Sequence, residues 1–173
     1  MMEYRRFYQS GARYFFTVLT ANRKPLLIDN IVRLRVAFKM CVTRYPFEIE
    51  AMVVLPDHLH TIWRLPEGDA DFSKRWMVIK RKFSSALPQE ATSPSKINKR
   101  EKGIWQRRFW EHCIRNEDDW RRHIDYIHYN PVKHGYVDTP QEWEYSSFRQ
   151  AVDKGWYLPS TVIIDDFDGV GSE

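Results

Sequence analysis

The sequence is poor in cysteine and has no long apolar run. Its 173 residues include two cysteines, Cys41 and Cys113, which are far apart and in no CxxC spacing. This argues against a disulfide scaffold or a zinc knuckle and favours a reducing cytoplasm. No stretch approaches the roughly 20 apolar residues that cross a bilayer, and the start, MMEYRRFYQSG, lacks the apolar core of a signal peptide. We therefore expect a cytoplasmic protein with no membrane partner.

An excess of acidic residues is also absent. The formal net charge is +4 and the isoelectric point is about 9.1, which leans toward a polyanionic partner. Aromatic residues make up 15% of the chain, either as core rings or as platforms for unpaired bases. Basic residues occur in pairs and triplets beside aromatic ones. This group comprises Arg5, Arg6, Lys74, Arg75, Lys80, Arg81, Lys82, Arg107, Arg108, Arg121 and Arg122. The pattern is also seen on solvated helix faces, but the aromatic neighbours favour nucleic-acid binding.

Hydrophobic periodicity predicts alternating strands and helices. Their order is strand, helix, strand, strand, helix, strand, helix, at residues 14–20, 31–43, 47–55, 58–65, 71–87, 109–115 and 117–128. This order predicts an α+β fold, a ferredoxin-like βαββαβ antiparallel sheet with helices mainly on one face. Pro131 is expected to end or kink the last helix at Asn130.

The domain organisation is predicted from composition. Residues 1–157 are expected to form a single domain. Within it, the polar and aperiodic segment 88–102 is an exposed loop. Residues 158–173 are expected to be a flexible acidic tail.

A His58-Leu59-His60 motif lies in the third predicted strand. Side chains two residues apart on a strand point to the same face, so the two imidazoles stand side by side and Leu59 points into the core. Two convergent imidazoles form half of a divalent metal site. Isolated motifs of this kind are usually surface histidines, so the prediction of a metal site depends on further ligands elsewhere in the sequence.

The second half of the predicted site lies on the last helix. Tyr126 and Asn130 are four residues apart and therefore share one helix face. An amide oxygen suits a hard cation, and a phenol is a possible nucleophile. Tyr129 is the competing phenol, but Lys133, four residues after it, cannot bind a metal. The alternative is that Tyr126 is a core ring and Asn130 a polar helix terminus.

Several longer segments resemble the REP-associated tyrosine transposases, which are single-tyrosine proteins of the HUH type. The likeness is carried by VVLPDHLHTIWRLPEGDADFSKRW and IWQRRFWEHCIRNEDDWRRHIDYIHYNPVKHGYV, with YRRFYQSGARYFFT and WEYSSFRQAV in addition. It extends over roughly residues 4–157. The separation between HLH and DYIHYNPVKHG makes it specific.

The resemblance implies particular roles and a HUH endonuclease or transposase-like fold. His58, His60 and Asn130 would hold Mg²⁺ or Mn²⁺, and Tyr126 would be the nucleophile. The family's N-terminal segment helps to read a short tetranucleotide beside the DNA hairpin, which corresponds here to Tyr4, Arg5 and Arg6 and less surely to Tyr8. Together with the basic pairs, the expected DNA contacts are Tyr4, Arg5, Arg6, Lys80, Arg81, Arg107, Arg108 and Arg122.

The implied activity is cleavage and rejoining of single-stranded hairpin DNA through a 5′-phosphotyrosine, by a monomer or homodimer. A replication initiator or relaxase with the same chemistry is a second hypothesis, and a non-catalytic binder of single-stranded nucleic acid is a third. The general base is open. His123 is either that base or a solvent-exposed or phosphate-contacting residue, and His112, beside Glu111, is equally ambiguous.

Overall fold

Four antiparallel strands form one sheet in the computed structural model, which describes residues 6, 8–90, 92–158 and 161–171. The strand order is β2-β3-β1-β4, with β1 and β3 in the middle. This is a ferredoxin-like arrangement and confirms the predicted α+β class. The strands are β1 (Arg13–Leu19), β2 (Glu48–Val54), β3 (His58–Arg64) and β4 (Trp110–Cys113).

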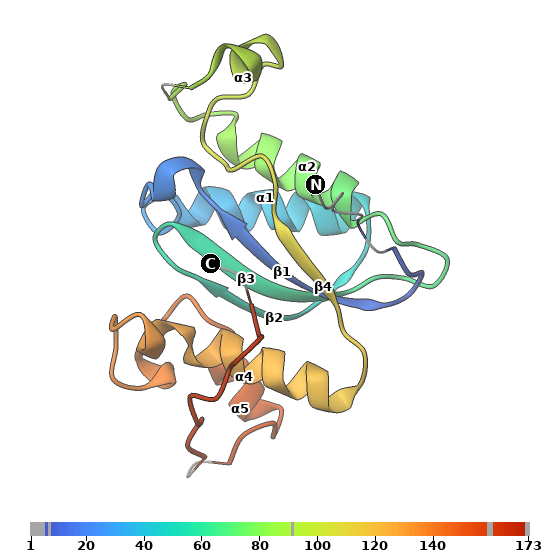
Figure 1. Cartoon of the computed structure of the whole chain (residues 1–173), viewed down its shortest axis with the longest axis vertical. Coiled ribbons are helices and arrows are strands. Elements are labelled where there is room, and N and C mark those ends of the chain that lie inside the picture. The colour runs from blue at the N-terminus through green and yellow to red at the C-terminus, as the bar shows by residue number, and fades with distance from the viewer. Residues whose placement is uncertain (1–5, 7, 91, 159–160, 172–173) are drawn as a thin grey trace.

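Helices cover both faces of this sheet (Figure 1). Helices α1 (Ile31–Arg44) and α2 (Phe72–Ser84) lie on one face, and α4 (Glu117–Lys133) and α5 (Phe148–Asp153) lie on the other. We predicted helices mainly on one face. Helices α1 and α2 do share a face, but α4 and α5 cover the other one. A short helix, α3 (Pro94–Asn98), interrupts the predicted loop 88–102, and short 3₁₀ turns lie at Ala21–Arg23 and Pro140–Glu142.

The larger core lies between the sheet and helices α1 and α2. Trp63 of β3 stacks on Trp76 of α2, with ring centroids 4.4 Å apart, and both indoles are buried. Phe16 of β1 packs against the same two rings. Leu59 is fully buried in this cluster, as the strand alternation predicted. Most aromatic residues of this half therefore stabilise the fold by burying large apolar areas.

A smaller core lies under α4. Ile124 and Ile127 of this helix pack against Phe15 and Ile62, which point to the opposite face of β1 and β3. These central strands therefore carry apolar residues on both faces, which explains why helices cover both. Trp120 fixes the start of α4, because its indole Nε1 donates to Glu50 of β2 at 2.8 Å.

We expected Pro131 to end or kink helix α4 at Asn130, and the helix does not end there. The helix continues to Lys133 with Pro131 inside it. Proline removes one backbone donor and disfavours helical geometry before it. Here Asn130 and Pro131 are both buried, and the Asn130 carbonyl accepts the backbone N–H of His134 at 3.0 Å. Tertiary packing on the sheet therefore outweighs the local preference.

The last described segment, residues 161–171, crosses α4 on its way to the sheet (Figure 1). Val170 is buried there, and Ile163 and Phe167 pack against the smaller core. In the described part of the chain, no helix has the length and apolar character needed to span a membrane.

Candidate active site

Strand β3 places His58 and His60 side by side on the face covered by α4. Both side chains are buried, and their ring centroids are 5.0 Å apart. Thr17 of β1 is the cross-strand partner of His60 in the sheet register. The pair therefore stands in the interior at the centre of the sheet, which is not the position of two unrelated surface histidines.

Neighbouring side chains fix the orientation of both imidazoles. His58 Nδ1 lies 2.7 Å from Asp57 Oδ1, and His60 Nδ1 lies 2.9 Å from Thr17 Oγ1. When each Nδ1 carries the proton and donates to its partner, Nε2 of each ring keeps its lone pair. A partner of this kind commonly orients a metal-binding histidine. Burial alone would raise the pKa of Asp57, but His58 and Arg23 lower it below its usual value, so this acceptor is charged.

Helix α4 brings Tyr126 and Asn130 to the two histidines. The Tyr126 and His60 ring centroids are 5.1 Å apart, and Asn130 is fully buried one turn further along. The helix is well defined at its start, because Asn116 Oδ1 accepts the backbone N–H of Asp119 at 2.8 Å. Acidic residues in its first turn also stabilise the helix, because their negative charge interacts favourably with the positive end of the helix dipole.

The competing phenol, Tyr129, lies to one side of this cluster. Its described ring contact is with Phe167, at 5.8 Å between centroids. Tyr126, in contrast, contacts His60 and has the Lys133 ammonium 4.9 Å from its ring centroid. The geometry therefore agrees with the spacing argument that favoured Tyr126.

The C-terminal segment covers Tyr126. A Cβ placed on Gly171 would lie 2.7–2.8 Å from Cε1, Cζ and the hydroxyl of Tyr126, so the glycine backbone rests directly on the phenol. The Phe167 ring meets the Tyr126 ring at 5.4 Å, and Arg122 donates to the Asp168 carbonyl at 3.0 Å. We expected a flexible tail here; its described part instead packs on α4 through apolar residues spaced within an acidic segment.

Sequence reasoning missed three residues of the site. His134 has its ring centroid 5.1 Å from that of His58. It follows Asn130 by four residues, so the spacing that linked Tyr126 to Asn130 could have found it. Asp57 directly precedes His58, so its place in the site could also have been predicted from the sequence. The place of Thr17 could not, because its contact with His60 depends on the strand register.

Two further histidines, His112 and His123, form a cluster with Asp119 on this side of the sheet. His123 is buried, its Nδ1 donates to the Asp119 carbonyl at 2.7 Å, and its ring stacks on His112. Burial lowers the pKa of His123. It is therefore not solvent-exposed, and its described ring contacts are with His112 and Phe15. His112 and Asp119 bond at 2.8 Å, joining β4 to α4.

The predicted DNA contacts fall into three groups. Tyr4 and Arg5 lie outside the described residues. Four others line one cavity beside α2, and they are Arg6, Lys80, Arg81 and Arg107. Arg108 and Arg122 are exposed elsewhere on the surface.

Arg75 is one of the clustered basic residues of the sequence, but it is not among the expected DNA contacts. It is buried and bound to both carboxylate oxygens of Asp69, at 2.9 and 2.7 Å. Asp69 and the carbonyl oxygens of Tyr45 and Pro46 hold it in place. Charge pattern alone cannot separate such a structural arginine from a DNA contact.

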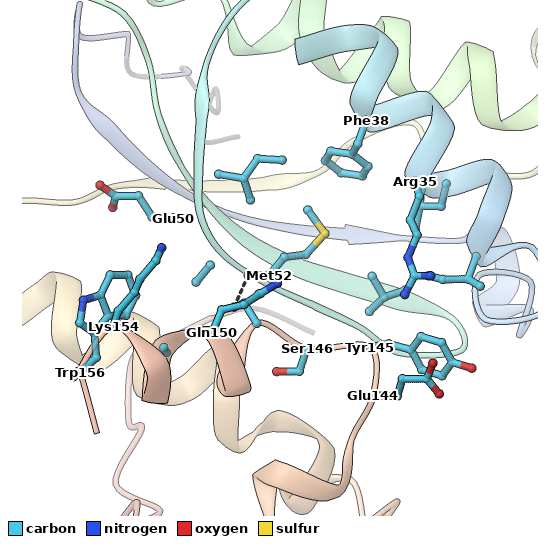
Figure 2. Close-up of a pocket in the computed structure, with 17 residues that line it drawn as sticks. Arg35, Phe38, Glu50, Met52, Glu144, Tyr145, Ser146, Gln150, Lys154 and Trp156 are labelled. Carbon is cyan, nitrogen blue, oxygen red and sulfur yellow. Dashed lines mark hydrogen bonds between the residues drawn. The ribbon is translucent and has the colours of Figure 1, made fainter. Parts of the chain in front are cut away.

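A cavity of about 610 Å³ lies away from the histidine pair, between α1, β2 and residues 144–156 (Figure 2). Its labelled residues include Arg35 and Phe38 from α1 and Met52 from β2. Basic Arg35 and Lys154 are matched there by acidic Glu50 and Glu144. This balance of charge gives no preference for a polyanion, and the candidate catalytic residues do not line this cavity.

Comparison with known proteins identifies the family of this chain. Residues 8–130 match the family model described as "Transposase IS200 like". The chain is 48% identical over 158 residues to the REP-associated tyrosine transposase of Escherichia coli, which covers 91% of this chain and 88% of that protein. It also superposes on a solved REP-associated tyrosine transposase bound to a REP hairpin, with a TM-score of 0.83 and 44% identity, over 100% of this chain and 98% of the other.

The matched region contains His58, His60, Tyr126 and Asn130. The chain therefore belongs to the IS200-like transposases, and within them to the REP-associated tyrosine transposases.

Proposed function

We propose that this transposase cleaves and rejoins single-stranded DNA beside a REP-type hairpin, with Tyr126 as the nucleophile. The observation that carries the proposal is the meeting of β3 and α4, where the Tyr126 ring lies 5.1 Å from the His60 ring. A relative of 44% identity was solved bound to a REP hairpin, which supports hairpin DNA as the substrate.

The side chains present fit a divalent cation. Two imidazoles have Nδ1 held by Asp57 and Thr17, and the buried amide of Asn130 adds an oxygen donor on the same face of α4. In this proposal His58, His60 and Asn130 hold Mg²⁺ or Mn²⁺. Such an ion, when bound, neutralises charge on the scissile phosphate.

The residues of the chain perform the transfer itself. The Tyr126 oxygen forms a bond to phosphorus, and the bond from phosphorus to the 3′ oxygen breaks. The products are a 5′-phosphotyrosine and a free 3′-hydroxyl, to which a proton is delivered as the phenol loses its own. A second 3′-hydroxyl can reverse the step on another strand without ATP, because the linkage conserves the bond energy.

The surroundings of Tyr126 match this role. Phenols ionise near pH 10, so attack at neutral pH needs help in removing the proton. The Lys133 ammonium, 4.9 Å from the ring centroid, places positive charge where the phenolate develops. Gly171 and Phe167 cover the phenol, so the tail moves aside before a phosphate reaches it.

One chain supplies all four site residues, so the chemistry needs no second copy, and the proposal holds for a monomer and for a homodimer. Cys41 and Cys113 are free thiols, in keeping with the proposed cytoplasmic location.

A denaturing gel tests the proposal directly. The protein is incubated with Mn²⁺ and a labelled REP hairpin that carries an unpaired flank. We expect a covalent adduct that is absent from Tyr126→Phe and present in Tyr129→Phe, the matched phenol on the same helix. Tight binding by the wild type with no adduct would favour a non-catalytic binder instead.

A further inference from the structure

A group of three side chains that can bind a metal lies apart from the His58 and His60 pair. It consists of His112 in β4, Asp119 in the first turn of α4 and His123 one turn later. Each side chain offers one ligand atom, and these three atoms all lie within 4.8 Å of one another. Within the residues that the structure describes, no other three histidine, cysteine, aspartate or glutamate side chains meet this condition.

The spacing of these ligand atoms suits a small ion. His112 Nε2 lies 2.8 Å from Asp119 Oδ2, and His123 Nδ1 lies 3.3 Å from Asp119 Oδ1. The bonds of a tetrahedral zinc ion are about 2.0–2.2 Å long, so its nitrogen and oxygen ligands lie about 3.3–3.5 Å apart. The two imidazole rings are already stacked, with an interplanar angle of 11° and centroids 4.7 Å apart. Small rotations of the side chains therefore bring both rings and the carboxylate around one ion.

The donor set indicates which ion would bind. Two imidazoles and one carboxylate suit Zn²⁺ and neighbouring transition ions such as Co²⁺, whereas Mg²⁺ prefers oxygen ligands. The His112 side chain is 26% exposed, so an ion can enter from solvent and water can fill its fourth position. Burial lowers the pKa of His123, so this imidazole is neutral at pH 7 and can bind a metal without first losing a proton.

Hydrogen bonds already connect these side chains, and a bound ion would replace some of them. His123 Nδ1 donates to the Asp119 carbonyl at 2.7 Å, and the Arg115 backbone N–H donates to Asp119 Oδ2 at 2.9 Å. When an ion takes one nitrogen of each imidazole, the ring carries its proton on the other nitrogen. The Arg115 guanidinium lies 3.4 Å from Asp119 Oδ2, but this side chain is 74% exposed and can turn into solvent. Arg115 is therefore a charge that competes with a bound cation.

We propose that His112, Asp119 and His123 form a second metal site, which binds Zn²⁺ or a similar transition ion and joins β4 to α4. The site is distinct from the candidate active site, because β1 lies between β3 and β4 in the sheet. The Phe15 ring of β1 contacts both His123, at 4.7 Å between centroids, and His60, at 5.6 Å. An ion in the second site would hold the first turns of α4, the helix that carries the candidate nucleophile.

Zn²⁺ binding to the full chain tests this assignment by calorimetry and by the amount of metal retained after dialysis. Zn²⁺ can also bind the His58 and His60 pair, so the measurement is made in His60→Gln, where that pair is broken. We expect His60→Gln to retain about one equivalent of Zn²⁺. Adding His112→Gln should weaken this binding by more than about 10–100-fold, the usual effect of losing only a partner of a metal ligand. Asp118→Asn removes an exposed carboxylate of the same helix turn and, as the matched control, should leave the affinity unchanged.

Two further comparisons do not depend on a variant that loses binding through damage to the fold. Arg115→Gln should bind Zn²⁺ about twofold more tightly, because an exposed ion pair no longer competes for Asp119. In the otherwise unchanged chain, His112→Gln should lower the total bound Zn²⁺ by about one equivalent, with the His58 and His60 pair intact. Zn²⁺ should also raise the unfolding temperature of His60→Gln and leave that of His60→Gln/His112→Gln unchanged, since a ligand that binds the folded state stabilises it.

The results that would overturn the assignment are distinct from a failure of the proposed chemistry. The second site is refuted if His60→Gln retains no Zn²⁺ and His112→Gln leaves the total bound by the wild type unchanged. It is also refuted if Zn²⁺ binds His60→Gln but His112→Gln weakens this binding no more than Asp118→Asn does, because the metal would then be adventitious. None of these measurements uses DNA, so the covalent adduct tests the nucleophile independently.

Discussion

The contact between Gly171 and Tyr126 predicts that an added methyl group on the tail activates the protein. Gly171 has φ +76°, and in Gly171→Ala the new Cβ would lie 2.7–2.8 Å from the Tyr126 ring and hydroxyl. Carbon atoms pack best at about 3.5–4.0 Å, so the tail cannot stay in place unchanged. We expect it to leave the phenol, which would open Tyr126 to DNA.

The size of the effect follows from two costs. Left-handed backbone geometry costs about 1–2 kcal/mol for alanine relative to glycine. Overpacking adds typically about 1–3 kcal/mol. Since about 1.4 kcal/mol corresponds to tenfold, each cost weakens tail docking by about tenfold. The rate of adduct formation should rise by up to the combined factor, until the chemical step itself becomes limiting.

Gly169→Ala separates the two costs. Gly169 also has positive φ, at +77°, but a Cβ there meets nothing within 4 Å. This control therefore carries the backbone strain alone. In single-turnover assays with a flanked hairpin and Mn²⁺, we expect Gly171→Ala to react fastest, Gly169→Ala next and the wild type slowest. Equal or slower reaction by Gly171→Ala would refute the conclusion that this contact limits access.

Three further predictions concern the carboxylate beside His58 and two buried side chains. Asp57→Asn should weaken Mn²⁺ binding by about 10–100-fold in calorimetry while His58 remains in place, because the oriented imidazole loses its charged partner; unchanged affinity would contradict this. Burial lowers the pKa of His128 to about 3, so the unfolded state binds the extra proton, and stability should fall below about pH 6.5 by about 1.4 kcal/mol per pH unit from this residue. Urea titrations of His128→Asn should show a shallower dependence. Trp63→Ala should cost about 3–5 kcal/mol of unfolding free energy, because it leaves a cavity beside Trp76, and a loss below about 1 kcal/mol would contradict that packing.

The strands, and the strand and helix that carry the candidate site, were predictable because their signals are local. The alternation around Leu59 placed both histidines on one face, and the spacing of Tyr126 and Asn130 placed them on one side of a helix. Both arrangements follow from backbone periodicity alone. The sheet order also followed from the sequence of elements.

What could not be predicted depends on contacts between distant segments. The continuation of α4 through Pro131 reflects burial against the sheet, which outweighs a local helix-breaking preference. Phe167 and Val170 are single apolar residues in an acidic segment, so no periodicity indicated that they pack. In the sequence, Arg75 cannot be distinguished from the basic residues near it, because its buried ion pair with Asp69 is formed only in the folded protein.

The attachment point of the DNA tests the central claim most directly. The covalent adduct formed with a flanked REP hairpin is digested with a protease and a nuclease, and the modified peptide is sequenced by tandem mass spectrometry. We predict a nucleotide joined through its 5′ phosphate to the oxygen of Tyr126. A nucleotide on Tyr129, on another residue or joined through a 3′ phosphate would contradict the account.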